Sequence, residues 1–229
     1  MKENRQQEME GIPEQPPKPK KEDKAKNTLI EEAEFVVFDL ETTGLGARFG
    51  DEIIEIAGVR IKNGKVVDKF CSLVNPCRPI SPGATAVNGI TDEMVAGAPK
   101  ISEVLPAFLE FSKGSVLVAH NTPFDMSFLL EKMKQINYRN FKEEALDTLV
   151  LSRKIHSEEK SHSLPSIRRR LNINCESEHR AMGDVAATGE ILILFLDVLV
   201  KGGVRTLKDL NKFHGGDPYK YVKMYNRMF

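Results

Sequence analysis

A chain of 229 residues is long enough for one well-buried domain with tails. Its 33 Lys and Arg residues balance 33 Asp and Glu residues, which excludes the global basic surplus of a nucleic-acid coat protein. Cys71, Cys77 and Cys175 form no C-x-x-C pair, so reduced thiols fit better than a disulfide framework or a zinc site. No apolar run approaches the roughly 20 residues of a membrane span. These properties predict a soluble, cytoplasmic protein with no membrane contact.

Residues 1–28 mix Lys and Glu with four prolines and contain little that could be buried. Ordering such a segment would cost conformational entropy without a compensating gain, so we expect a disordered charged and Pro-rich tail. Its lysines could instead touch nucleic acid, although Glu22 and Asp23 interrupt them, which favours a solvated linker.

Three strands are expected next along the chain. Residues 35–40 (FVVFDL) and 53–61 (IIEIAGVRI) are apolar runs of strand length, and Asn63-Gly64 separates the second run from residues 65–74. Because Asn-Gly favours a two-residue hairpin turn, the three strands should be antiparallel neighbours.

Helices and strands alternate in the second half. A loop rich in Pro and Gly spans residues 75–99, and Ser102 can cap a helix that ends near Phe111. We expect strands at 115–119 and near Ala145. Helices are expected from a cap at Thr122 to about Asn137, from a cap at Asp147 or Thr148, at 164–171 and at 181–200. This order predicts an α/β fold with a mixed sheet flanked by helices.

Two carboxylates lie on one face of the first strand. Side chains alternate along a strand, so Asp39 and Glu41 emerge together at its end. Burial and mutual repulsion disfavour their charged forms unless a divalent cation compensates. The alternative is a buried hydrogen-bonded Asp39 and a solvated Glu41, and the strand alone does not choose between the two interpretations.

Three further residues are candidates for the same site. Asp125 lies in the first turn of the helix after the strand at 115–119, although an acid there also complements the helix dipole. Asp184 borders the apolar stripe of the last long helix and should point toward the protein. His179 lies in the polar approach to that helix, where a lone histidine is more often structural.

Three short motifs occur in order: D-L-E-T-T-G-L at residues 39–45, H-N-x-x-F-D at 120–125 and H-x-A-x-x-D at 179–184. Together they resemble the motifs of the DEDDh exonuclease superfamily. The V-N-G-I-T of residues 87–91 makes the sequence most similar to the epsilon-type proofreading exonucleases of bacterial replicative polymerases. The resemblance implies a ribonuclease-H-like fold with a mixed five-stranded sheet.

The same resemblance implies roles for the site residues. Two divalent cations, Mg²⁺ or Mn²⁺, would be held by the four carboxylates, and His179 would be the general base. The first ion would be bound by Asp39, Glu41 and Asp184, the second by Asp39, and Asp125 would contribute largely through water. Two cations can stabilise both ends of an in-line displacement at phosphorus, and hard cations prefer oxygen ligands.

The resemblance also implies that the segment after the first motif grips the terminal nucleotide, which makes Thr42, Thr43, Leu45 and Asn121 candidate substrate-binding residues. Leu45 would wedge against the base. The alternative is a plain turn with a core leucine. Residues 87–91 could line the same groove, although Asn88-Gly89 also has the composition of an ordinary turn.

Residues 204–229 form a basic and aromatic C-terminal extension to a nuclease domain at 29–203. Six Lys and Arg residues face only two Asp residues there, and three Tyr residues and Phe229 are interleaved with them. This composition suits stacking on single strands or docking on a partner. Packing back onto the domain is an equal alternative.

The expected function is a metal-dependent 3′→5′ exonuclease that acts on single-stranded or mismatched DNA 3′ ends, in proofreading or repair, with a DNA polymerase subunit as a candidate partner. An RNA-trimming exonuclease of the same fold is the nearest alternative, because nothing in the sequence reports on a 2′-hydroxyl. A non-catalytic, polymerase-associated binding subunit is another, although the intact set of four acids and a histidine argues against it.

Overall fold

The computed structural model describes residues 27–174 and 180–228. Five strands form one mixed sheet in the order β3-β2-β1-β4-β5, which confirms the predicted fold class. β1 pairs antiparallel with β2 and parallel with β4, which in turn pairs parallel with β5. The strand bounds are Glu34–Thr42 (β1), Ile53–Lys62 (β2), Lys65–Leu73 (β3), Val116–Ala119 (β4) and Ala145–Asp147 (β5).

The hairpin between β2 and β3 turns at the predicted Asn-Gly pair. Asn63 and Gly64 both have positive φ, 51° and 67°, the conformation that a type I′ turn requires at its two central positions. The turn fixes the register in which Lys62 faces Lys65. A local sequence signal therefore sets the pairing of β2 with β3.

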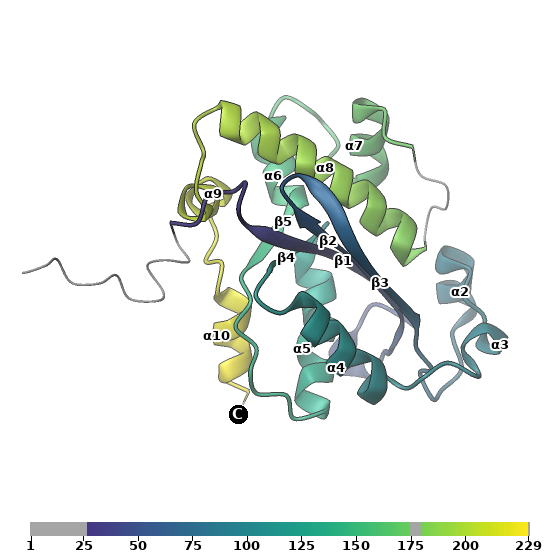
Figure 1. Cartoon of the computed structure of the whole chain (residues 1–229). Helices are drawn as coiled ribbons and strands as arrows, with labels where there is room; N and C mark the ends of the chain where they lie inside the picture. Colours follow the sequence, from purple (N-terminus) through teal and green to yellow (C-terminus); the bar gives the residue numbers. More distant parts are fainter. Residues whose placement is uncertain (1–26, 175–179, 229) are drawn as a thin grey trace, which may run out of the picture.

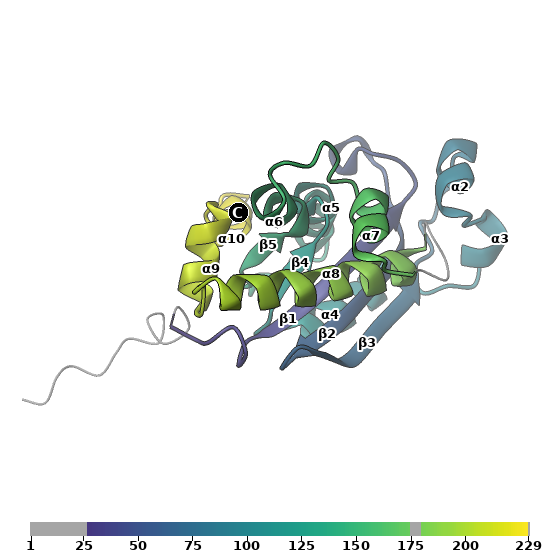
Figure 2. The ribbon, with the colours of Figure 1, turned by 90° about the horizontal axis from the view of Figure 1, so that it is seen from above.

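Helices cover both faces of the sheet (Figures 1 and 2). The side of β1 that carries Phe35 and Val37 packs with α8 (Ala181–Lys201), while Val36 and Phe38 pack with α4 (Ile101–Ser112) and α5 (Thr122–Gln135) on the other side. Two further helices, α6 (Thr148–Ile155) and α7 (Leu164–Leu171), contribute to the α8 side. β1 is the central strand of the sheet, and helices pack on both of its faces.

Two helix starts differ from the prediction. Ser102 lies inside α4, which begins at Ile101, so the residue before the helix is Lys100. The Glu103 carboxylate accepts a hydrogen bond of 2.9 Å from the Lys100 amide. Thr122 is the first residue of α5 and not its cap; its hydroxyl donates to the Leu146 carbonyl at 2.6 Å. Asp147 caps α6 as predicted, accepting from the Leu149 amide at 2.9 Å.

The segment 75–99, predicted to be a loop, contains two short helices. Ser81 caps α2 (Pro82–Asn88) and Thr91 caps α3 (Asp92–Val95), and Gly89 ends α2 with φ of 71°. Proline is tolerated at the first helical position and glycine after the last, so the composition that suggested a loop also suits a short capped helix. Figures 1 and 2 place α2 and α3 at the opposite end of the molecule from the C-terminal helices.

The C-terminal residues pack back onto the rest of the chain. Helices α9 (Leu207–His214) and α10 (Lys220–Asn226) bury Leu210, Tyr221 and Tyr225, and the Tyr225 hydroxyl donates to the Tyr138 carbonyl. These tyrosine rings are therefore not available to stack on a nucleic acid, which decides between the two alternatives for them.

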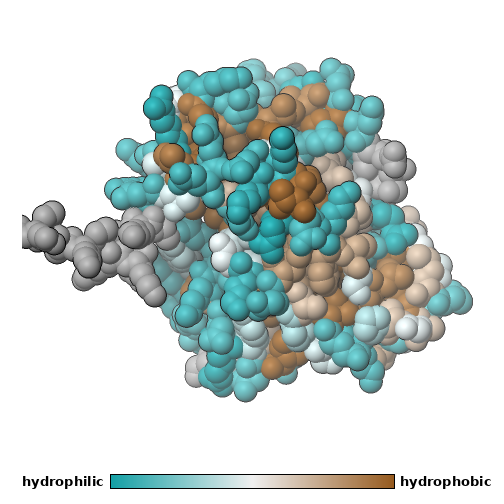
Figure 3. Space-filling model, viewed as in Figure 1, coloured by the Kyte–Doolittle hydropathy of each residue, from teal (hydrophilic) through white to brown (hydrophobic). Residues whose placement is uncertain are grey.

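Figure 3 shows a face that mixes hydrophilic side chains with apolar patches, both at the top and across the centre and lower right. Leu194 and Val198 are exposed apolar residues of α8. Within residues 27–174 and 180–228, no helix combines the length and the apolar character needed to cross a bilayer.

Candidate active site

Three carboxylates from two elements meet at the end of β1. Asp39 and Glu41 follow each other on one face of β1, and Asp184 comes from the first turn of α8. One oxygen from each of the three lies within 4.8 Å of the others. Strand alternation thus places Asp39 and Glu41 together. The packing of α8 on β1 and β2 brings Asp184, which is distant in sequence, beside them.

Asp125 lies against the same strand from the α5 side. Its side chain is 2% exposed, and its Oδ1 accepts a hydrogen bond of 3.2 Å from the Leu40 amide, between the two strand acids. The Asp125 carboxylate therefore belongs to the acidic cluster, although it does not share the close grouping of the other three. His179 lies outside the described residues, so its position relative to the cluster stays a prediction.

The pKa values of three acids in the cluster are raised. Burial, followed by the charge of Asp125, raises the pKa of Asp39 well above its usual range. Burial and the nearby Asp184 raise the pKa of Glu41 to about 7, and burial raises the pKa of Asp125 to about 8. Each charged form is disfavoured because the carboxylates lose water and repel one another.

The donor set fits a hard divalent cation. All the converging atoms are carboxylate oxygens, the ligands that Mg²⁺ and Mn²⁺ prefer. In the described part of the chain, no lysine or arginine forms an ion pair with Asp39 or Glu41. Arg180 is the nearby positive charge that lowers the pKa of Glu41, but it does not prevent the rise of that pKa, so the cluster has room for the charge of a divalent cation.

These pKa shifts predict a pH-dependent loss of stability in the absence of metal. A carboxylate with a raised pKa in the folded state stabilises the fold fully below its unfolded pKa of about 4, and that contribution is lost as the pH rises through the folded pKa. With chelator, we expect the melting temperature to fall by about 5 °C or more between pH 6.5 and 8.5. Saturating Mg²⁺ should remove most of that fall, and Asp125→Asn should flatten it. Equal melting curves at the two pH values with chelator would contradict this.

Glu55 is a site residue that the sequence analysis did not identify. It lies on β2 directly opposite Glu41 and is 2% exposed. Its carboxylate accepts from Arg180 Nη2 at 2.8 Å, from Arg180 Nε at 3.2 Å and from the Ala181 amide at 3.1 Å. Glu55 thereby fastens the start of α8 to β2. The available signal was one acid among the apolar residues of the first half of β2.

Asn88 accounts for the position of the V-N-G-I-T segment. Its side chain is buried, donates to the Thr42 carbonyl at 3.4 Å and hydrogen-bonds the Glu41 carboxylate, which opposes the rise of the Glu41 pKa. Gly89, the next residue, makes the turn. The turn is thus confirmed at Gly89, and the lining of the nucleotide groove by residues 87–91 stays a prediction.

The four candidate substrate-binding residues differ in exposure. Thr42 and Thr43 are buried, and the Thr43 hydroxyl accepts from the Glu52 amide at 3.0 Å. Leu45 is 86% exposed, which excludes the alternative of a core leucine. Asn121 is exposed in the left-handed conformation, and its amide donates to Asp147 Oδ1 at 3.0 Å. Only Leu45 and Asn121 present side chains outward.

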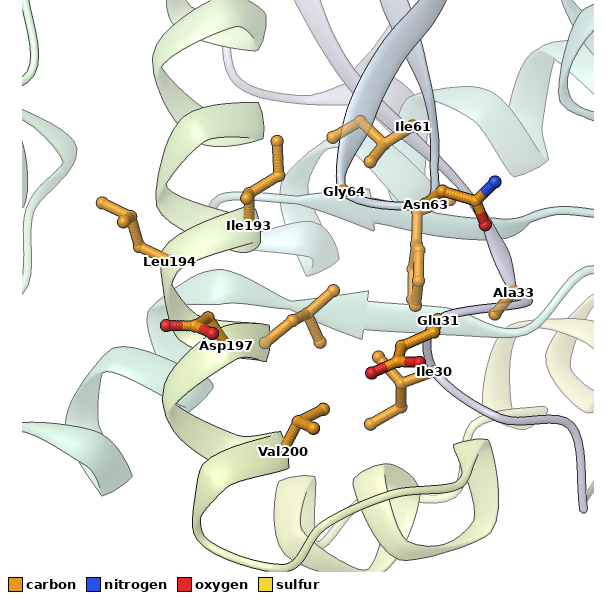
Figure 4. A pocket seen from close by; sticks show the side chains of 12 residues that line it. Ile30, Glu31, Ala33, Ile61, Asn63, Gly64, Ile193, Leu194, Asp197 and Val200 are labelled. Carbon is orange, nitrogen blue, oxygen red and sulfur yellow. The ribbon is translucent and has the colours of Figure 1, made fainter.

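A groove of about 640 Å³ lies at the other end of β1 (Figure 4). Apolar side chains of β1, β2 and α8 line it, and Glu31 and Asp197 stand at its rim. Asp39 and Glu41 lie near the C-terminal end of β1, whereas the groove is lined by Phe35 near its N-terminal end. The groove is therefore separate from the candidate active site.

Comparison with known proteins agrees with the fold and the acidic cluster. Residues 36–192 match the family RNase_T, described as Exonuclease. The chain belongs to this family of DnaQ-like 3′-5′ exonucleases. Within it, the chain is related to the PolC and epsilon-like proofreading exonucleases of DNA polymerase III.

Two curated relatives show the extent of this similarity. A DNA polymerase III PolC-type from Caldanaerobacter subterraneus subsp. tengcongensis is 47% identical over 180 residues, covering 79% of this chain and 13% of the relative. A DNA polymerase III subunit epsilon-like protein from Rhodobacter capsulatus is 47% identical over 183 residues, covering 78% and 26%. The chain thus spans about an eighth to a quarter of the length of these relatives.

Solved structures extend the match. Exonuclease X in complex with 5′ overhanging duplex DNA has a TM-score of 0.63 and 31% identity, covering 79% of this chain and 99% of that one. Exonuclease I from E. coli with a dA16 oligonucleotide has a TM-score of 0.66 at 18% identity, covering 74% and 43%, which shows a shared fold.

Proposed function

We propose that this protein is a metal-dependent 3′→5′ exonuclease that hydrolyses the last phosphodiester bond of a DNA strand and releases nucleoside 5′-monophosphates. The observation that carries the proposal is the convergence of Asp39, Glu41 and Asp184 within 4.8 Å, on a fold shared with exonucleases. Four buried or half-buried acids, three of them with a raised pKa, would be a liability in a passive binding subunit, which favours catalysis.

The residues divide the chemistry among them. Two bound Mg²⁺ or Mn²⁺ ions would stabilise the charge that develops on the attacking and leaving oxygens. Asp39, Glu41 and Asp184 would hold one ion, Asp39 would also hold the second, and Asp125 would act through water. His179 would take the proton of the attacking water, a role that suits its ordinary pKa of about 6.5.

The strand end would be held beside these acids. Leu45, which is exposed and follows Thr42 by three residues, would press on the terminal base, and Asn121 would contact the same nucleotide from the start of α5. Thr42 and Thr43 would act through their backbone, because their side chains are buried within the loop.

DNA is the favoured substrate because both curated relatives are named as DNA polymerase III proteins and Exonuclease X was solved with duplex DNA. A proofreading or repair role in the cytoplasm, beside a DNA polymerase, is consistent with these relatives.

One assay tests this function. A 5′-labelled single strand of DNA, a mismatched primer-template and an RNA of equal sequence are each incubated with Mg²⁺, Mn²⁺ or chelator. We expect stepwise shortening of the DNA substrates with either metal and none with chelator. Faster shortening of RNA would show that RNA, and not DNA, is the preferred substrate. Internal cuts or no cleavage would refute the proposal that the protein is an exonuclease.

His179→Ala is expected to lower kcat by about 10²- to 10⁴-fold, because a general base contributes about that much. The affinity for a single strand in Ca²⁺ should change little. His156→Ala is the matched control, since His156 packs against the Phe195 ring and not with the carboxylates. Turnover of His179→Ala within threefold of the control would exclude a general base at this position.

A further inference from the structure

The loop between β1 and β2 (residues 43–52) exposes two large apolar side chains. Leu45 is 86% exposed and Phe49, at the end of the short helix η1 (Ala47–Phe49), is 93% exposed. Exposed apolar side chains that occur together on one loop can mark a binding site, and an aromatic ring offers a large flat surface to a ligand. Arg48 beside it is exposed as well and carries a positive charge.

The loop is held firmly from within. The Asp51 carboxylate accepts from the Gly46 amide at 2.9 Å and from the Thr43 hydroxyl at 3.3 Å. It fills the space beside Gly44 so closely that a Cβ there would lie 2.4 Å from Asp51 Oδ2. The Thr43 amide also donates to the Glu52 carbonyl at 2.9 Å. The loop therefore has one compact arrangement around Asp51.

Two neighbouring elements anchor the same loop. Lys132 of α5, whose side chain is fully buried, pairs with Glu52 at 2.6 Å. From the α2 side, the Ser81 hydroxyl donates to the Thr43 carbonyl at 3.2 Å, and the Arg78 guanidinium donates to the Gly50 carbonyl. Phe49 is thus exposed on a fixed support. Presenting a ring in this way lowers the entropy cost of binding a ligand to it.

Phe49 packs against Gly46, the residue that follows Leu45. Its amide donates to the Gly46 carbonyl at 2.9 Å, and its ring covers Gly46 so closely that a Cβ there would lie 2.6 Å from Phe49 Cδ2. The loop starts at Thr43, two residues after Glu41, whose carboxylate belongs to the cluster. A strand whose end lies at the carboxylates has this loop as an adjoining surface.

We propose that Phe49 forms a second base-stacking subsite, which receives a nucleobase on the 5′ side of the terminal nucleotide of the bound strand. This inference rests on the proposed function and adds a subsite to it. Aromatic rings accept any base by stacking. The positive charge of the neighbouring Arg48 would attract the phosphates of the strand. The subsite should favour single-stranded or frayed ends, where a base is free to leave its partner.

Binding measurements test the subsite without hydrolysis. The fluorescence anisotropy of a 5′-labelled single strand is followed with Ca²⁺ in place of Mg²⁺, for the wild type, Phe49→Ala, Phe49→Trp and the control Val66→Ala. We expect Phe49→Ala to bind about tenfold more weakly, and Phe49→Trp and Val66→Ala to bind within twofold of the wild type. Val66 is an exposed apolar residue of β3, at the far edge of the sheet.

Substrates with one abasic site at the second, third or fourth position from the 3′ end identify the base. At the position that Phe49 contacts, the abasic site should remove the difference between wild type and Phe49→Ala; at the others the difference should remain. Equal affinity of the two proteins for the intact strand, or a loss that no abasic site removes, would overturn the subsite. If the wild type binds with these effects yet cleaves no strand with Mg²⁺, the proposed function fails and the subsite stands.

Discussion

Asp39→Asn is expected to slow the hydrolysis of single-stranded DNA by about 10³-fold or more. Asp39 is the residue proposed to bind both cations, and an amide oxygen replaces a charged ligand of each. The rate of monophosphate release with saturating Mg²⁺ measures this. Asp68→Asn is the control, because Asp68 is an exposed acid of β3 and should leave the rate unchanged.

The same substitution should stabilise the metal-free protein. Asp39 is disfavoured by burial and by repulsion from Asp125, Glu41 and Asp184, and the amide removes that repulsion. With chelator at pH 8.5, Asp39→Asn should therefore melt at a higher temperature than the wild type, while Mg²⁺ should stabilise it less. An inactive variant that also melts earlier would indicate damage to the fold and would contradict this account.

Glu55→Ala is expected to lower the free energy of unfolding by about 3 kcal/mol. Three hydrogen bonds are lost, and the Ala181 amide at the start of α8 loses its acceptor while buried. Urea unfolding followed by circular dichroism measures the change. Glu55→Gln should lose less, because its carbonyl still accepts from the amide.

Glu34→Ala is the matched control for Glu55→Ala. Glu55 pairs with one cation, Arg180, whereas Glu34 pairs with two, Arg60 and Lys62, but the Glu34 side chain is 32% exposed. Exposed ion pairs contribute about 1 kcal/mol or less. If Glu55→Ala and Glu34→Ala lose equal stability, the anchoring of α8 by Glu55 is wrong.

Much of the fold could be predicted because its signals are local. The Asn63-Gly64 turn and the alternation along β1 depend on residues a few positions apart, and they set the pairing of β2 with β3 and the shared face of Asp39 and Glu41. Asp184 was predictable as an inward-facing acid of its helix. Its meeting with β1 depends on how α8 packs, which only the resemblance to known motifs supplied.

The features that were missed depend on distant partners. Glu55 looks like an isolated acid in an apolar strand until Arg180 and the start of α8 are brought beside it. The helices within residues 75–99 were hidden because Pro and Gly serve helix ends as well as loops. The burial of Tyr221 and Tyr225 could not be distinguished from exposure, because composition does not state which side of a short helix meets the core.

The C-terminal helices have a consequence for where this enzyme's physical boundary lies. The family match ends at residue 192, within α8, whereas the apolar interior continues through Leu210 to Tyr225. α10 contacts α5, the helix whose first turn carries Asp125. The packed unit of the structure is therefore longer than the segment that the family match covers, and residues beyond that match hold in place the helix that carries Asp125.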